Sequence, residues 1–263
     1  MRAYLSTFRL RFKLETQYRG AALGGLVCQL FFAFILIALY RALYETRGQS
    51  VALSGVITYV WLQQACFRLL LSSDQELTLT IAEGGMAYHL CRPVSQYFYW
   101  YSRALAQKLV GCALRAAPML LIAFLLPGGW GIGAPASPRA LLLFLASLVP
   151  GILCICALDN IASGVTIHSL DPRGVNSLLS LLMMMFSGNL LPLTLFPDAW
   201  QAALRFSPYT QLLDAPIRMY TGLLTGRETA FSLLLQFLWS AALISLGAWI
   251  WNRNLKRVVV QGG

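Results

Sequence analysis

Few side chains in this sequence have the types and spacing that chemistry requires. The two histidines, His89 and His168, lie far apart, and no carboxylate lies at ligand spacing from either of them. The cysteines include no Cys-x-x-Cys pair, and most of them lie inside apolar stretches, where cysteine usually packs as a small hydrophobic side chain. We therefore expect no catalytic residue, no metal site and no cofactor in this chain.

The composition decides the class of protein. Of the 263 residues, 58% are hydrophobic and only 11% are charged, whereas a soluble domain carries about 25% charged residues. The formal net charge is +10, which on a soluble domain would suggest a nucleic-acid partner. In so apolar a chain, basic loops follow instead from the preference of positive charge for the cytoplasmic side of a membrane. We expect an integral membrane protein that contacts the lipid bilayer and no nucleic acid.

Six apolar runs are long enough to cross the roughly 30 Å hydrocarbon core as helices, which takes about 20 residues. They lie at about 21–43, 51–71, 105–126, 140–160, 175–196 and 230–251. The first run stays as a helix, because its basic leader is too long for a signal peptide and no cleavage site follows. The sequence predicts an all-α membrane protein, with a six-helix transmembrane domain at 21–263 and a separate N-terminal segment at 1–20.

Six spans place both chain termini on the same side of the membrane. About twice as many Lys and Arg residues flank the spans on that side as on the other. Both termini are therefore predicted to be cytoplasmic.

Polar groups inside the predicted spans are the candidates for an intramembrane site, because an ionisable group at that depth is costly and usually faces a partner or a cavity. They are Arg115, Asp159, Asn160 and Asn189. Arg115 lies near the middle of the third span and Asp159 near the cytoplasmic end of the fourth, so their depths differ. Three interpretations stay open: Arg115 pairs with Asp159, the two line a solute path, or Arg115 snorkels. Asn189 more often joins helices by hydrogen bonds.

The N-terminal segment 1–20 has a helical pattern. Its aromatic and aliphatic residues fall on one face at helical spacing, with basic residues beside them. This pattern predicts an amphipathic helix in the headgroup region of the bilayer. Whether the helix only anchors the chain or also contacts a cytosolic partner stays open.

The longest cytoplasmic connection runs from Ser72 to Ala104. Acidic residues after two serines favour a short helix near its start. Gly84 and Gly85 end that helix, a second one follows over 86–91, and Pro93 stops the second helix. We predict a bent, partly apolar elbow between the second and third spans.

The longest external connection, from Pro197 to Thr229, also carries helix signals. The residues that define it are Pro197, Asp198, Trp200, Pro208 and Asp214. Pro197 interrupts the preceding helix and Asp198 could cap a new one, so we expect helices near 199–206 and 209–221. Their many aromatic residues favour a helical hairpin that re-enters the outer leaflet. A surface cap that never enters the membrane is the alternative.

Three segments carry a resemblance to a known family. Residues 81–95, IAEGGMAYHLCRPVS, resemble the acidic-Gly, Leu and Arg-Pro-hydrophobic-Ser pattern between the second and third spans of ABC-2 type permeases, subunits of ABC exporters. Residues 186–200, FSGNLLPLTLFPDAW, followed by Phe206-Ser-Pro-Tyr, are similar to the fifth span and external segment of those permeases. The tail from Trp249 resembles the end of one uncharacterised branch of that family.

The resemblance implies a half-transporter of a bacterial inner membrane that pairs with a second permease chain, as a homodimer or a heterodimer. A separate ABC ATPase, in two copies, would bind ATP and Mg²⁺ on the cytosolic side. The elbow would act as the coupling helix. Its candidate coupling residues are Glu83, Gly84, Gly85, His89, Arg92 and Pro93.

This chain is not itself expected to be an ATPase. A P-loop needs Gly-Lys-Ser/Thr to hold the phosphates, and the lysines Lys13, Lys108 and Lys256 follow Phe, Gln and Leu. The substrate is expected to be hydrophobic or amphipathic, such as a drug, a peptide or a lipid.

Two other classes remain as alternatives. A secondary transporter usually shows internal repeats, several buried charges or broken helices, whereas only Pro118 and Pro192 clearly interrupt the predicted spans. A membrane-embedded enzyme such as a rhomboid-like protease needs Gly-x-Ser-Gly, but Met185 occupies the first glycine position before Ser187-Gly188. Co-purification of an ATPase would separate both alternatives from an exporter.

Overall fold

The computed structural model of the chain describes residues 2–17, 19–46, 52–71, 75–127, 129–169, 172–189, 193 and 196–256. Within these ranges the secondary structure is helical and contains no β-strand. The prediction of an all-α protein is therefore confirmed. His168 and Asp198 belong to helices, but their side chains, like Pro192, lie outside the described part of the structure.

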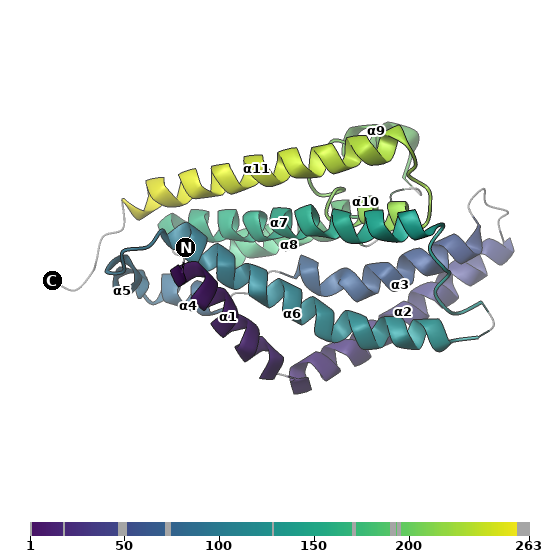
Figure 1. Cartoon of the computed structure of the whole chain (residues 1–263), viewed down its shortest axis with the longest axis horizontal. Coiled ribbons are helices and arrows are strands. Elements are labelled where there is room, and N and C mark those ends of the chain that lie inside the picture. Colours follow the sequence, from purple (N-terminus) through teal and green to yellow (C-terminus); the bar gives the residue numbers. More distant parts are fainter. Residues whose placement is uncertain are drawn as a thin grey trace.

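Six helices run roughly along one direction and form the bundle (Figure 1). They are α2 (Arg19–Thr46), α3 (Leu53–Leu70), α6 (Gln96–Leu125), α7 (Pro138–Ser169), α8 (Pro172–Phe186) and α11 (Arg227–Leu255). Five shorter helices complete the described chain: α1 (Arg2–Gln17), α4 (Gln75–Ala82), α5 (Met86–Leu90), α9 (Asp198–Leu204) and α10 (Asp214–Tyr220).

Four helices of the described chain are long and apolar enough to cross a membrane: α2, α6, α7 and α11. The chain is thus a multi-pass membrane protein. The helix α3 has 18 residues, but Gln63, Gln64 and Arg68 lower its hydropathy. The helix α8 has 15 residues, fewer than the roughly 20 that a perpendicular span needs. The two further predicted spans, which correspond to α3 and α8, therefore stay predictions.

Two predicted features of the third span differ from the structure. The span was expected to begin at about 105, whereas α6 begins at Gln96. Ser95, the residue before α6, has an extended backbone, with φ −64° and ψ 118°. Pro118 was expected to break the span, but α6 continues through it. Pro150 likewise lies inside α7, and neighbouring helices commonly stabilise such prolines in membrane helices.

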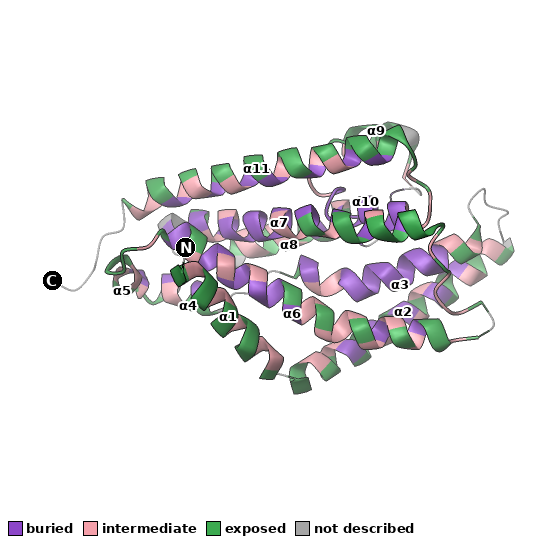
Figure 2. Ribbon diagram, in the orientation of Figure 1, coloured by how far each residue is buried: buried purple, intermediate pink, exposed green. Residues whose placement is uncertain are grey.

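The helix α3 lies at the centre of the bundle, where Trp61 and Val60 are completely buried. Figure 2 shows α3 mostly buried, whereas the outer faces of α2 and α11 are exposed. Those exposed faces carry large apolar side chains, among them Phe31, Phe237 and Leu238. An apolar outer surface of this extent suits hydrocarbon rather than water.

Glycines let α7 and α11 approach closely. A Cβ atom at Gly164 of α7 would lie 2.7 Å from Cδ1 of Trp251 in α11. Gly247 of α11 makes a similar close approach to α6, because a Cβ atom there would lie 2.7 Å from Cε2 of Tyr97. The Trp251 indole N–H donates to the carbonyl of Asn160 at 2.6 Å. Small residues and interhelical hydrogen bonds of this kind are the usual means of joining helices in membranes.

The two ends of the bundle have different connections. The start of α1, the end of α11 and the short helices α4 and α5 lie at one end (Figure 1). The helices α9 and α10 lie toward the opposite end. The two long connections singled out by the sequence are therefore at opposite ends of the molecule.

Candidate functional site

The elbow between α3 and α6 is built by local sequence signals. The helix α4 ends at Ala82, and Gly84 then takes a φ of +74°, which favours glycine because it has no Cβ. The helix α5 follows from Met86 to Leu90, and the Arg92 N–H donates to the His89 carbonyl at 3.2 Å. The structure thus has helices at both predicted positions, separated by the predicted glycine break.

The candidate coupling residues divide into an exposed tip and an inward contact. Glu83, Gly84, Arg92 and Pro93 are exposed, and Gly85 is half-buried. Tyr88 is also exposed, at 80%. The elbow therefore presents a mixed polar and aromatic tip at its end of the bundle.

His89 turns toward the bundle. Its ring lies 5.1 Å from the ring of Trp100 and 5.9 Å from that of Tyr99, measured between centroids. Burial, and then the positive charges of Arg92 and Arg103, lower the pKa of His89 below its usual range. The lowered pKa favours the neutral imidazole, and the half-buried ring packs against α6.

Glu76 on α4 joins the elbow to two other helices. Its carboxylate forms an ion pair with Arg103 of α6 and lies 3.5 Å from Nη1 of Arg11 in α1. Burial raises the pKa of Glu76, but the hydrogen bond and charge of Arg103, with the charge of Arg11, outweigh burial and lower it overall. From the sequence, Glu76 could be placed only in the first turn of the helix that follows Ser72. Its ion pair with Arg103 could not be predicted, because it depends on how α6 is rotated about its axis.

The helix α1 lies against α6 and touches both ends of the elbow. Its Tyr4 hydroxyl accepts the Ser95 N–H at 3.0 Å, and its ring packs edge-on against Phe98. Tyr4 is half-buried, while Leu5 and Phe12 on the same predicted apolar face are exposed. Part of the face predicted to meet lipid is therefore used against α6.

Lys108 is a second tie between helices, and it is only 1% exposed. Its ammonium Nζ lies 2.7 Å from Oδ2 of Asp159 in α7. The same nitrogen donates to the carbonyls of Leu69 and Leu71 at the end of α3, at 2.7 Å each. Those carbonyls are left without helical partners and carry the negative end of the helix dipole. One buried cation thus connects α3, α6 and α7 directly behind the elbow.

The Lys108–Asp159 pair replaces the pairing considered from sequence. In the described chain, Asp159 forms its ion pair with Lys108, and no ion pair joins it to Arg115. Lys108 precedes Arg115 by seven residues, about two helical turns, which brings it to the depth of Asp159. The Arg115 guanidinium lies over Gly25 of α2, where a Cβ atom would come within 2.5 Å of Cζ.

The two candidate asparagines have different surroundings. Asn160 is buried, and its Nδ2 donates to the Cys156 carbonyl at 2.8 Å within α7. Its own carbonyl accepts from Trp251 of α11, which joins the two helices. Asn189 is also buried, and its Oδ1 has no hydrogen-bond partner among the described residues. The structure therefore brings Asn160 next to the Lys108 cluster and leaves Asn189 at the other end of the bundle, after α8.

The connection from Pro197 to Thr229, named the external segment after its predicted side, is anchored through Asp214, which is completely buried. The Tyr59 hydroxyl of α3 donates to Asp214 Oδ1 at 2.9 Å, and the Asp214 N–H donates to the Ser187 carbonyl at 3.1 Å. Asp214 Oδ2 also lies 3.7 Å from Nη1 of Arg218. Asp214, predicted within the second helix of the external segment, is thus a structural anchor of α10 on α3.

The two external helices are shorter than predicted. Pro197 is exposed and precedes α9, which runs from Asp198 to Leu204. The second helix was expected from 209, but α10 starts at Asp214. The residues after Pro208 form turns instead, in which the Gln211 N–H donates to the Pro208 carbonyl at 3.1 Å. Trp200 remains 55% exposed.

The described residues contain no group of three or more His, Cys, Asp or Glu side chains that could hold a metal ion. The polar clusters instead fasten helices to one another at the two ends of the bundle.

Comparison with known proteins agrees with this architecture. No curated protein shows significant similarity to the chain. A family model described as "ABC-2 family transporter protein" matches residues 26–262, which include the elbow, the external segment and the long helices from α2 to α11. The match covers most of the 263 residues, and the chain therefore belongs to the ABC-2 family of transporter proteins, as a membrane permease.

Proposed function

We propose that this chain is the transmembrane subunit of an ATP-driven exporter in a bacterial inner membrane. It would pair with a second permease chain and with two copies of a separate ATPase, which bind ATP and Mg²⁺. All six bundle helices would cross the membrane, with both termini in the cytoplasm. The elbow over 74–95 would receive the ATPase.

The observation that carries this proposal is the connection of the exposed elbow to the bundle. An ATPase can shift a permease only through contacts that differ between two states. The tip residues Glu83 and Arg92 are exposed for such contacts. Behind them, Glu76 is tied to α6 through Arg103, and Lys108 joins the ends of α3 and α7. A displacement of the elbow would therefore act on three membrane helices at once.

The six-span arrangement is supported by the positions of α3 and α8. The helix α3 is packed between α2 and α6 and has a buried apolar surface. Its Gln and Arg residues are tolerated because protein rather than lipid surrounds them. The helix α8 reaches about 22 Å at 1.5 Å per residue, and Ser187, Gly188 and Asn189, all buried, continue the chain toward the external end.

The path would run between two permease chains along α2, α3 and α8. The helix α8 presents an exposed apolar face that includes Leu178, Leu181 and Met185. Methionine adapts to partners of different shape. Such a face suits a second permease chain and a hydrophobic or amphipathic substrate.

The test is co-purification of the tagged permease with its ATPase, followed by measurement of ATP hydrolysis in lipid. Glu83→Lys and Arg92→Glu should leave the permease folded and reduce both ATPase recovery and transport. Glu45→Lys and Arg227→Glu change equally exposed charges at the opposite end and serve as matched controls. Retention of the ATPase by both elbow variants, or loss in the controls, would contradict the proposal.

A further inference from the structure

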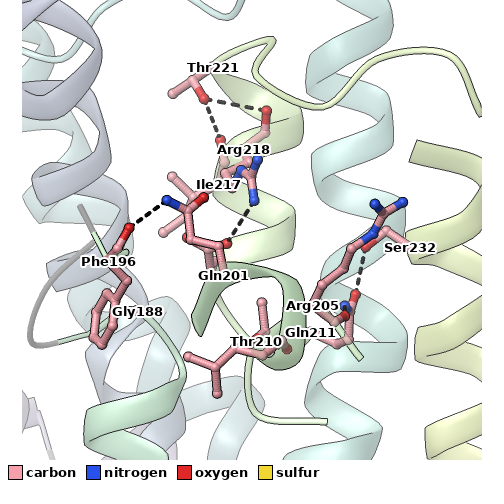
Figure 3. Close-up of polar contacts among 12 residues, drawn as sticks. Gly188, Phe196, Gln201, Arg205, Thr210, Gln211, Ile217, Arg218, Thr221 and Ser232 are labelled. Atoms are coloured by element: carbon pink, nitrogen blue, oxygen red, sulfur yellow. Dashed lines mark hydrogen bonds and ion pairs between the residues drawn. The ribbon is translucent and has the colours of Figure 1, made fainter. Parts of the chain in front are cut away.

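The external end contains a cavity that the exporter mechanism does not use. It has a volume of about 200 Å³ and lies among α9, α10 and the start of α11. Polar side chains that line it include Gln201, Arg205, Gln211 and Arg218. In Figure 3, Arg218 lies beside Gln201, and Arg205 lies beside Gln211.

Hydrogen bonds fix the frame of this cavity. The Gln211 side chain donates to the Arg205 carbonyl at 2.9 Å and accepts from the Ser232 hydroxyl at 2.6 Å. The Gln211 carbonyl accepts from Gln236 Nε2 at 2.9 Å. The Gln201 side chain is also held, because its Nε2 donates to the Phe196 carbonyl at 2.7 Å. The cavity is thus a built feature that links α9, α10 and α11.

The two arginines keep hydrogen-bond donors available. The Arg205 guanidinium lies over the ring of Phe231, 5.2 Å from its centroid, and no described acceptor binds it. Arg218 Nη1 is 3.7 Å from Asp214 Oδ2, too far for a good hydrogen bond. Arg218 Nε is buried and has no partner among the described residues. Arg205 is exposed, so its donors lie on the open side of the cavity, whereas Arg218 Nε is removed from water without an acceptor, which is costly. A ligand that supplies acceptor oxygens would satisfy both arginines.

The charge and shape of the cavity narrow the ligand. Asp214 is already engaged by Tyr59, and Glu228 is exposed at the rim. Asp214 Oδ2 also lies 3.7 Å from Nη1 of Arg218. The two carboxylates therefore offset part of the arginine charge and disfavour a second negative charge on the ligand. Leu193, Leu224 and Phe231 provide an apolar wall, and the volume accommodates a headgroup but not acyl chains.

We propose that this cavity binds the singly charged phosphate or carboxylate group of an anionic amphiphile. Its oxygens would accept hydrogen bonds from Arg205 and Arg218, which match such groups in a bidentate geometry. Its apolar part would leave along Phe231 toward the exposed apolar surface of α11. The group can belong to a lipid of the outer leaflet or to a soluble anion, and the binding needs neither ATP nor an ATPase.

The experiment measures binding to the purified, full-length permease in detergent, without an ATPase, by calorimetry. The probes are dihexanoyl phosphatidylglycerol, the matching phosphatidylcholine and glycerophosphoglycerol, the soluble phosphodiester with the same singly charged headgroup. We expect phosphatidylglycerol to bind best, and Arg205→Gln and Arg218→Gln each to weaken it about tenfold, the effect of losing a charge-assisted hydrogen bond. Arg227→Gln removes an exposed arginine outside the cavity and should bind as the unmodified chain does.

The probes also identify the source of the anion. Binding of phosphatidylglycerol alone supports a lipid headgroup, and equal binding of glycerophosphoglycerol supports a soluble anion. Arg218→Lys retains the charge beside Asp214 and serves if Arg218→Gln unfolds. Equal binding by the unmodified chain and the Arg205→Gln chain, or equal loss in Arg227→Gln, overturns the proposal. Neither result depends on whether the chain exports a substrate.

Discussion

Lys108 and Asp159 form a buried ion pair, with Nζ 2.7 Å from Oδ2, at the point where α3, α6 and α7 meet. The ammonium also binds the carbonyls of Leu69 and Leu71, so its three N–H donors each have an acceptor. The negative charge of Asp159 and the end of α3 thus share one cation. Removing either charge should affect the position of the elbow as well as the stability of the bundle.

The first prediction concerns that pair. Lys108→Met leaves a buried carboxylate and two α3 carbonyls without their cation, and breaking such a pair typically costs about 3–5 kcal/mol. Asp159→Asn should cost less, because an amide oxygen can still accept from Lys108. Thermal unfolding in detergent measures the stability of both variants. The double variant, Lys108→Met with Asp159→Asn, should lose less stability than the two single variants lose together. Lys256→Met, an exposed lysine at the end of α11, is the control. Equal thermal stability of Lys108→Met and Lys256→Met would contradict the structure.

The second prediction concerns pH. Because Arg103 and Arg11 lower the pKa of Glu76 in the folded chain, the carboxylate stabilises the elbow at pH values above the usual pKa of glutamate, about 4.3. This contribution is lost as the pH falls through the lower, folded pKa. The protection of the α4 amides in hydrogen exchange, taken relative to the exchange rate of the unfolded chain at the same pH, should therefore fall as the medium is acidified below about pH 4.3.

The matched variants isolate the Glu76 carboxylate. Glu76→Gln should make α4 exchange fast at neutral pH and remove much of its acid dependence. Glu83→Gln changes an exposed glutamate of the same elbow and should retain the pH dependence. An unchanged pH profile in Glu76→Gln would show that other groups hold α4 in place.

The elbow illustrates which features the sequence could predict. Gly84 and Pro93 act on their own backbone, and the structure has its helix breaks at those positions. The ties behind the elbow depend instead on the rotation and depth of separate helices. Lys108 lies near the predicted cytoplasmic start of the third span, and hydropathy does not show that a lysine there is paired with Asp159.

The external segment gives the same lesson at the other end of the bundle. Pro197 and Pro208 predicted where helices are interrupted. The burial of Asp214, however, depends on Tyr59, which lies far away in the sequence. Local signals therefore locate the short helices, whereas the partners of charged residues require the packed bundle.

The third prediction concerns Gly188, which connects α8 to the external segment. It has a φ of +81°, and a Cβ atom there would collide with the Tyr59 hydroxyl and lie 3.1 Å from Cβ of Asp214. Gly129 has a similar φ of +74°, but a Cβ atom there would have no neighbour within 4 Å. Gly129→Ala should thus cost only the backbone strain, about 1–2 kcal/mol.

Gly188→Ala should cost more than Gly129→Ala, because the collision adds to the strain. Thermal unfolding of the two variants measures the difference. Adding Tyr59→Phe to Gly188→Ala removes the colliding hydroxyl but also the hydrogen bond to Asp214, so it should restore only part of the loss. Equal destabilisation by the two alanine substitutions would show that α3 and the external segment are less closely packed.

The last prediction concerns the orientation in the membrane. Asp214 lies in the predicted external segment, but it is completely buried and therefore unsuitable for labelling. Thr225 is exposed in the same external segment, and the native Cys91 is exposed on the elbow. Two variants are therefore compared: one retains Cys91 as its sole cysteine, and the other carries Thr225→Cys as its sole cysteine.

A membrane-impermeant maleimide should label Thr225→Cys in intact cells and Cys91 only after the cells are permeabilised. The expectation follows from the basic residues that flank the elbow end, since positive charge is retained in the cytoplasm. Labelling of both variants after permeabilisation shows that each cysteine can react, which separates topology from burial. If intact cells label Cys91 and not Thr225→Cys, the elbow faces outward, where no cytosolic ATPase could bind it.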